Sequence, residues 1–321
     1  MIENLDLKNR RILYELEQDS RQSLQEIAKK VRLKKETVFH RMKNLEKLGI
    51  IKNYLTEVDI YKLGYQFYPM LIRYQNTNPE IENKIYDFLK KNKFVSWLTK
   101  SEGNWDINLA LIAKNNFEIK KFLDEFYSKF DEYIGEKHIL ITTEIYYFKR
   151  GFWLNKPSNE TVTTGQNDSQ KIKLDELDYK LLKILSSKAR KPLIEIADEL
   201  KMNPKNISYK IKKLEKEQII QGSRILVDFS KMGYKFYKVW FSLKNINPEN
   251  FQKLLLYFKQ NPNIIWATKT IGYYDLSIEM EVKDVDEFRK ILDEIKEKFS
   301  NFIKKHESLL IFEEGILNYF P

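Results

Sequence analysis

The sequence contains no cysteine, and this absence narrows the kinds of site that the chain can hold. Without thiols there are no disulfides, no thiolate zinc sites and no cysteine nucleophile. Histidine is scarce, with three residues in 321, and these three (His40, His138 and His306) show no metal-ligand spacing. No glycine-rich loop of the kind that holds phosphates is present either. We therefore expect no metal, no cofactor, no catalytic residues and a protein that is not an enzyme.

Long apolar runs are also absent. No run reaches the roughly 18 residues that suggest a membrane span, and the N-terminal MIENLDLKNRR carries charges where a signal peptide needs an apolar stretch. We expect a cytoplasmic protein with no membrane partner. Hydrophobic residues make up 42% of the chain, enough for real cores, so wholesale disorder is not expected. The net charge of +10 allows an anionic partner without naming one, since AT-rich genomes also favour lysine.

The sequence contains an internal repeat: residues of the first half recur in the second half at an offset of 169 positions. Glu26-Ile27-Ala28 returns as Glu195-Ile196-Ala197, and other identities keep the same spacing. A period this long indicates a duplicated domain pair, because solenoid repeats run to roughly 20–50 residues. The pairs that show the offset include Leu5 and Leu174, Arg21 and Arg190, Gly64 and Gly233, Trp97 and Trp266, Asp106 and Asp275.

Each copy opens with three predicted helices. In the third helix of copy one, Val38, Met42 and Leu45 recur at helical spacing, and Gly49 ends it. In copy two, Asn203-Pro204 forms a good cap and first turn for the matching helix. Three helices with a short turn before the third suggest a winged or simple helix-turn-helix, whose last helix enters the major groove of DNA. We place these winged-helix-like helix-turn-helix domains at residues 1–60 and 173–229.

The side of each third helix opposite its apolar stripe is rich in groups that can donate hydrogen bonds to phosphates and base edges. These residues are our candidates for contacts with double-stranded DNA. A solvated surface face explains the same pattern, so the interpretation stays open at this point. The candidates are Lys35, Glu36, Thr37, His40, Arg41, Lys43 and Asn44 in copy one, and Lys205, Asn206, Ser208, Tyr209, Lys210, Lys212 and Lys213 in copy two.

The rest of each copy follows the order βαββαβ, which is typical of a ferredoxin-like sheet with both helices on one face. We place these α+β domains at residues 61–154 and 230–321. The polar segment 155–172 between the copies reads as a flexible linker with nothing to bury. The expected elements of copy one are strands 67–74, 95–100, 106–113 and 137–148 and helices 79–91 and 117–130; those of copy two are strands 236–243, 264–270, 275–282 and 305–318 and helices 248–260 and 285–299.

A short segment recurs in both sheet domains: a threonine, then a glycine, and an aspartate three residues after the glycine. Glycine tolerates positive φ and aspartate caps turns, so a hairpin explains the segment by itself. The functional alternative is a turn that holds the charged groups of a small effector. Its candidate residues are Thr99, Gly103, Asp106, Thr268, Gly272 and Asp275. The repeated aromatics near Phe67 and Phe236 are interpreted as packing at the joint between the two copies rather than as platforms for bases.

With these features in this order, twice, the chain resembles the Lrp/AsnC family of feast/famine regulators. The resemblance is carried by Leu5–Leu13, Leu174–Leu182, Ile27–Ile51 and its copy, Gly64 and Gly233, and the two Gly-x-x-Asp turns. It implies DNA binding by the helical domains, dimerisation by the sheet domains and, near those turns, an amino-acid effector. Two fused copies imply an intrachain pseudo-dimer, with pairing of two chains left open. Lys34 and Lys35 depart from the small capping residue and proline that are common in the family.

Three functions remain open from the sequence. The first is a transcriptional regulator, and the second is a DNA-organising protein with little sequence preference. The third is an enzyme, because siroheme decarboxylases resemble this architecture and also occur as paired or fused copies. The third is disfavoured because the strands 95–100 and 264–270 supply lysine but no histidine or arginine to a pocket.

Overall fold

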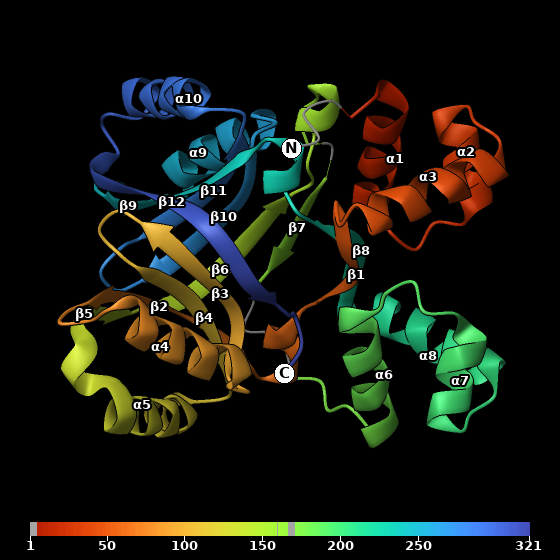
Figure 1. Cartoon of the computed structure of the whole chain (residues 1–321), viewed down its shortest axis with the longest axis horizontal. Coiled ribbons are helices and arrows are strands. Elements are labelled where there is room, and N and C mark those ends of the chain that lie inside the picture. Colours follow the sequence, from red (N-terminus) through yellow and green to blue (C-terminus); the bar gives the residue numbers. More distant parts are fainter. Residues whose placement is uncertain (1–4, 159, 166–170) are drawn as a thin grey trace.

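The computed structural model describes residues 5–158, 160–165 and 171–321, and Figure 1 shows the sheets and their covering helices on one side and two helical units on the other. Asp6 caps the first helix by accepting a hydrogen bond from the Asn9 amide at 2.7 Å, and Ser23 and Glu26 form a capping box on the second. Asn203 caps the helix Pro204–Lys216 as expected, whereas Lys34 gives the helix Lys35–Lys47 no side-chain cap. The helical units consist of α1 (Leu7–Gln18), α2 (Leu24–Val31) and α3 (Lys35–Lys47), and of α6 (Glu176–Ser187), α7 (Leu193–Leu200) and α8 (Pro204–Lys216).

A two-stranded antiparallel ribbon joins the two helical units (Figure 1). It consists of β1 (Ile51–Val58) and β8 (Ile220–Val227), with Leu55 opposite Arg224. Neither strand is part of the sequence prediction. Each pairs with a segment about 170 positions away, so the pattern of one copy alone does not reveal it.

Each sheet domain has the predicted βαββαβ order, with element bounds close to those expected. Copy one contains β2 (Gln66–Tyr74), α4 (Pro79–Lys91), β3 (Val95–Glu102), β4 (Ile107–Ala113), α5 (Asn116–Phe130), β5 (Ile134–Ile139) and β6 (Ile141–Phe148). Copy two contains β9 (Lys235–Leu243), α9 (Pro248–Gln260), β10 (Ile264–Ile271), β11 (Leu276–Val282), α10 (Val285–Lys298) and β12 (Ile303–Leu317). Short 3-10 turns lie at Ile60–Leu63, Asp131–Tyr133, Phe152–Leu154 and Ser230–Met232.

The last strand of each copy crosses to the other copy. The first part of β12 pairs with β9 of its own copy, and its second part pairs with β3 of copy one. In the same way β5 pairs with β2, whereas β6 pairs with β10 of copy two. Only Leu140 separates β5 from β6, so the hydrogen-bonded order β2-β4-β3-β12-β9-β11-β10-β6 returns to its start. The two sheets therefore enclose a shared interior.

Helices cover the outer faces of the two sheets. The core beneath α4 and α5 includes Phe122 and Phe126, and the core beneath α9 and α10 includes Phe258 and Ile295. In both clusters the buried residues alternate along the strands and recur at three- or four-residue spacing along the helices, as expected. No helix among the described residues is both long enough and apolar enough to span a membrane.

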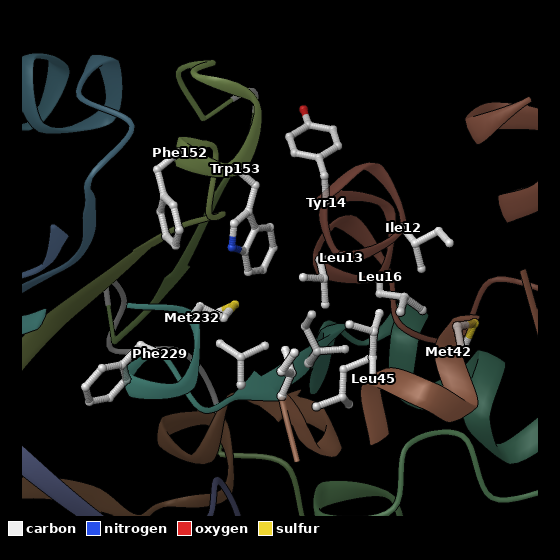
Figure 2. Close-up of a cluster of buried hydrophobic side chains, with 14 of the residues drawn as sticks. Ile12, Leu13, Tyr14, Leu16, Met42, Leu45, Phe152, Trp153, Phe229 and Met232 are labelled. Atoms are coloured by element: carbon white, nitrogen blue, oxygen red, sulfur yellow. The ribbon is translucent and has the colours of Figure 1, made fainter. Parts of the chain in front are cut away.

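The core of each helical unit is completed by the other copy. Leu13 and Leu16 of α1 pack with Ile225 and Val227 of β8, and the cluster continues to Trp153 and its neighbours (Figure 2). In the matching cluster, helices α6 to α8 pack against Val58, Ile60 and Ile112 of copy one. The two copies are thus intertwined at the sheets, at the ribbon and at the helical units.

The segment between the copies is more ordered than the sequence suggests. Residues Thr161–Thr164 form β7, which pairs with β6, and Ser158 is buried. The prediction of a linker with nothing to bury is therefore wrong for this part, because β6 presents an edge that a polar, threonine-rich segment can pair with. Residues 159 and 166–170 of that predicted linker lie outside the described residues.

Candidate DNA-binding faces and the cavity between the sheets

The outer face of α3 is exposed to solvent at most of its positions. Val38, Met42 and Leu45 are buried as predicted, and their burial turns the opposite side of the helix outward. Among the candidates of copy one, Thr37 and Arg41 are half-buried and Lys35, Glu36, His40, Lys43 and Asn44 are exposed.

The outer face of α8 is similar in exposure and different in chemistry. Lys205 and Lys212 have no ion-pair partner among the described residues, whereas Lys43 of α3 pairs with Glu46 at 2.8 Å. Tyr209 is 70% exposed. Of the remaining candidates of copy two, Ser208 and Lys210 are half-buried and Asn206 and Lys213 are exposed.

One residue of these faces was missed. Phe39 of α3 is 42% exposed and lies edge-on to His40, with ring centroids 5.6 Å apart. An exposed aromatic on a predicted recognition helix is a signal that the sequence already carried, because Phe39 lies outside the apolar stripe of Val38, Met42 and Leu45.

Arg41 and Lys210 occupy equivalent positions, and both fasten the third helix to the first helix of their unit. Arg41 Nη1 lies 2.8 Å from Asp6 Oδ2. Lys210 Nζ lies 2.7 Å from carboxylate oxygens of both Asp175 and Asp178, and this hydrogen bond lowers the pKa of Asp175. Each side chain therefore has a structural role that competes with the predicted DNA contact.

The two Gly-x-x-Asp turns are hairpins whose aspartates are used within the fold. Asp106 Oδ2 accepts a hydrogen bond from the Tyr74 amide at 2.7 Å, and Asp275 Oδ2 accepts one from the Leu243 amide at the same distance. Gly103 has a φ of 136° and packs so closely that a Cβ there would lie 2.9 Å from Leu309 Cδ2. The glycine thus permits the turn of one copy to approach a strand of the other.

The threonines of the predicted effector site lie in different surroundings. Thr99 is fully buried, and its hydroxyl donates to the Asn108 carbonyl at 3.0 Å. Thr268 instead lines a cavity between the two sheets, whereas Gly272 is not part of the lining of that cavity. The structure therefore brings Gly103 together with Asp106, and Gly272 with Asp275, but gives the two threonines unlike roles.

The cavity between the sheets, which we call the central cavity, is the feature that sequence reasoning missed. Its volume is about 110 Å³, against roughly 10–15 Å³ for one water. The aromatic lining includes Trp97, Trp240, Trp266, Phe67 and Phe236. The charged lining consists of Arg150, Arg224, Lys238, Glu279, Glu281 and Glu314.

Two arginines therefore reach this interior, contrary to the argument made from the strands 95–100 and 264–270. Arg150 follows β6 and Arg224 lies on the ribbon, so neither belongs to the elements considered in the sequence. Phe67 and Phe236 line the same cavity, as expected for aromatics at the joint between the copies.

A buried ionic network connects the central cavity to α1. The Arg150 guanidinium donates to both carboxylate oxygens of Glu281 and, through Nη1 at 3.0 Å, to Glu17 of α1. The Tyr147 hydroxyl also donates to Glu17. Burial opposes the charge of Arg150, yet these carboxylates hold its pKa well above its ordinary value.

Arg224 has a less complete set of partners. It is 1% exposed and lies over the rings of Tyr147, Trp266 and Tyr319. Its Nε is 3.3 Å from Glu57 Oε1 without hydrogen-bond geometry. Burial raises the pKa of Glu57 to about 7, and Arg224 offsets only part of this effect. The Arg224 charge is therefore only partly neutralised near neutral pH.

The structure as a whole is similar to solved structures of the siroheme decarboxylase NirDL. The two likenesses have TM-scores of 0.63 and 0.64, at 12% and 13% identity, and cover 98% of this chain and 93% of the other. The expectation that the chain is not an enzyme is therefore wrong as a conclusion from the sequence, because an enzyme has this whole-chain fold. At this level of identity the likeness concerns the fold alone.

Sequence comparisons identify the family. A winged helix-turn-helix DNA-binding model matches residues 5–52 and again residues 174–221. The transcriptional regulator LrpA of Pyrococcus horikoshii is 31% identical over 127 residues, which span 40% of this chain and 89% of LrpA. The regulatory protein AsnC of Haemophilus influenzae is 24% identical over 144 residues, or 45% of this chain and 95% of AsnC. The chain thus belongs to the Lrp/AsnC family, as a tandem duplication about twice the length of these relatives.

Proposed function

We propose that the protein is a transcriptional regulator that binds double-stranded DNA through α3 and α8 of one chain. The observation that carries the proposal is the exposure of both third-helix faces on two units joined by one ribbon. Exposed Lys35, Lys205 and Lys212 are suited to phosphate contacts, which supply most of the affinity of such proteins. Phe39 and Tyr209 add planar groups that can pack against sugars or thymine methyls.

The chain acts as a pseudo-dimer whose two helical units are held at a fixed spacing. Arg21 Nη1 donates to the Ala189 carbonyl at 2.6 Å, and its equivalent Arg190 donates to the Gln22 carbonyl at 2.8 Å. These reciprocal bonds and the ribbon restrict movement between the units. Because α3 and α8 differ in sequence, the favoured target is two unlike half-sites rather than a perfect palindrome.

An amino-acid effector at the Gly-x-x-Asp turns and pairing of two chains both remain proposals. An effector there would have to bond to the oxygen of Asp106 or Asp275 that the backbone amide leaves available. A regulator of this kind acts where the DNA is, so the cytoplasm is the proposed compartment.

Selection of duplexes from a random pool by the full chain, followed by footprinting, tests this function. We expect enriched sequences with two half-sites and protection over both. Comparable affinity for scrambled duplexes would instead favour a DNA-organising protein with little sequence preference, and no retention of duplex at moderate salt would contradict both.

A second candidate is an enzyme that acts on a tetrapyrrole. The observation that favours it is the fold likeness to NirDL over 98% of the chain. One of the NirDL structures is a complex with an iron-uroporphyrin III analogue, and Arg150 and Arg224 supply cationic groups in the central cavity. Titration with iron uroporphyrin tests this candidate: a saturable change in the absorption band supports it, and an unchanged spectrum removes it.

A further inference from the structure

The charges of the central cavity belong almost entirely to one copy. At an offset of 169, five charged residues of copy two, Lys238, Glu279, Glu281, Arg224 and Glu314, face apolar equivalents in copy one. These equivalents are, in the same order, Pro69, Ala110, Ile112, Leu55 and Ile145. Both copies nevertheless form the same strands.

Formation of these strands therefore does not require the charges. Burying an ion pair costs desolvation energy that the attraction often fails to repay, and apolar residues at such positions are frequently neutral or stabilising. Copy one forms the equivalent strands with apolar residues at these positions, so the charged residues of copy two need another explanation. A ligand that they recognise is such an explanation, since perturbed groups and a concave aromatic site commonly mark binding sites.

Two carboxylates at the cavity wall have room for a further donor. Lys238 Nζ bonds to one oxygen of Glu279 at 2.5 Å, and Trp97 Nε1 donates to one oxygen of Glu314 at 2.9 Å. Within the described part of the chain the second oxygen of each carboxylate has no hydrogen bond. Burial raises the pKa of Glu314, and the neighbouring Glu279 carboxylate adds to this effect, so a cation between the two carboxylates would stabilise their charged forms.

Two buried polar atoms of the same cavity have no hydrogen bond among the described residues. One is the Thr142 hydroxyl, which is 1% exposed and lines the cavity. The other is Arg224 Nε, which is equally buried and has the Glu57 carboxylate nearby without hydrogen-bond geometry. Unsatisfied buried groups are costly, and a bound molecule is one way to satisfy them.

We propose that the central cavity binds a small planar organic cation, an aromatic amine, with its ammonium group between the Glu279 and Glu314 carboxylates. Lys238 and Arg150 are bonded to carboxylates, which an anion would have to displace. The Arg224 guanidinium lies over three aromatic rings and donates to the Tyr319 hydroxyl and the Ile225 carbonyl, so less of it is open to an anion. Indole rings favour a planar body and attract positive charge on their faces. Lys238 already lies 4.6 Å from the Trp97 ring and 4.8 Å from the Trp240 ring, so these rings accommodate a cation.

A ligand in the central cavity can also affect the DNA-binding helices, and this step rests on the proposed regulator function. Arg150 lines the cavity and bonds to Glu17 of α1, and α1 packs against α3 through the core of its unit. A ligand that shifts Arg150 therefore changes the support of one recognition helix. Ser186 stands at the position equivalent to Glu17, so the effect is confined to copy one.

Calorimetry on the full chain tests the site with tryptamine and with indole-3-propionate, which differ chiefly in the sign of the charge. We expect tryptamine to bind and the propionate to bind at least about tenfold more weakly. Glu314→Gln should weaken tryptamine binding by about tenfold. Glu313→Gln is the matched control, because Glu313 is the exposed neighbour and pairs with Lys100 outside the cavity.

A second variant removes the charges in a way that the fold accepts. Lys238→Met with Glu279→Ala deletes a buried pair together and restores the alanine found at position 110 of copy one. It should retain the folded circular-dichroism spectrum and lose tryptamine binding. Equal or tighter binding of the propionate, unchanged binding in both variants, or no binding of tryptamine to the wild type would each overturn the proposal.

The effect on DNA is measured separately. Tryptamine should change the affinity for a selected duplex in the wild type and leave it unchanged in the double variant. Because calorimetry needs no DNA, failure of the regulator function leaves the binding result standing, and failure of the cavity proposal leaves DNA binding standing.

Discussion

At the scale of single residues, the structure separates charges that hold the fold together from charges that remain available. Arg41 and Lys210 tie the third helices to the first, and Arg150 ties α1 to the sheet. Lys35, Lys205 and Lys212 have no ion pair among the described residues. This division could not be read from a helical wheel, because a wheel shows direction and not distance to the neighbouring helix.

Glu57 predicts a pH dependence of stability. Its pKa rises from an ordinary value of 4.5 to about 7, first because of burial. The native state therefore binds more protons than the unfolded state over this window, and stability falls as pH rises through it. Between pH 5 and pH 8 the free energy of unfolding of the wild type should fall by on the order of 3 kcal/mol relative to that of Glu57→Gln. The groups that act on Glu57 are Arg224, Glu17, Lys149 and Arg150.

Denaturant unfolding at both pH values measures this gain. Glu102→Gln is the control, because Glu102 is an exposed strand residue. The same change between the two pH values in wild type and Glu57→Gln would show that Glu57 titrates normally.

The clamp of Arg41 gives a second residue-scale prediction. Arg41→Met removes a partly exposed ion pair, so the free energy of unfolding in the absence of DNA should fall by about 1 kcal/mol. Lys35→Met, on the same helix and without an ion pair, should leave stability unchanged. If both variants unfold like the wild type, the Arg41–Asp6 ion pair does not stabilise the fold, which contradicts the structural role assigned to Arg41.

At the scale of elements, periodicity predicted the helices and most strands but not how they exchange between copies. The helix Pro79–Lys91 and its copy Pro248–Gln260 agree with the prediction residue for residue. The ribbon was missed, and so was the crossing of β12 from β9 to β3, because such pairings depend on segments far apart in the chain. The central cavity was missed for the same reason, since its walls come from both copies.

The reciprocal arginines next to the ribbon predict how the two helical units are coupled. Arg21→Ala with Arg190→Ala removes bonds from charged donors to carbonyls of the other unit, each worth about 1.5–3 kcal/mol. We expect lower stability and weaker binding to duplexes with two half-sites, but not to single half-sites. Lys29→Ala with Lys188→Ala, at exposed positions of the two units, is the matched control. An equal loss on single and paired half-sites would contradict coupling.

At the scale of the whole molecule, duplication has produced two helical units of similar form and one interior of unequal chemistry. The identity of the family follows from sequence features that occur twice in the same order. The whole-chain likeness to NirDL follows from the joint arrangement of the copies, which no single copy carries. The two findings together explain why the sequence predicts a DNA-binding family and yet does not exclude an enzyme.

The dependence of DNA affinity on salt tests most directly whether α3 and α8 lie on DNA. The logarithm of affinity falls with the logarithm of salt concentration by about 0.9 for each phosphate contacted. Replacing Lys35, Lys205 and Lys212 with glutamine should reduce this slope by about one per lysine. Replacing Lys84, Lys120 and Lys253, exposed on α4, α5 and α9, makes the same change in net charge and should leave the slope unchanged. An unchanged slope in the first variant, or an equal reduction in both, would contradict the account.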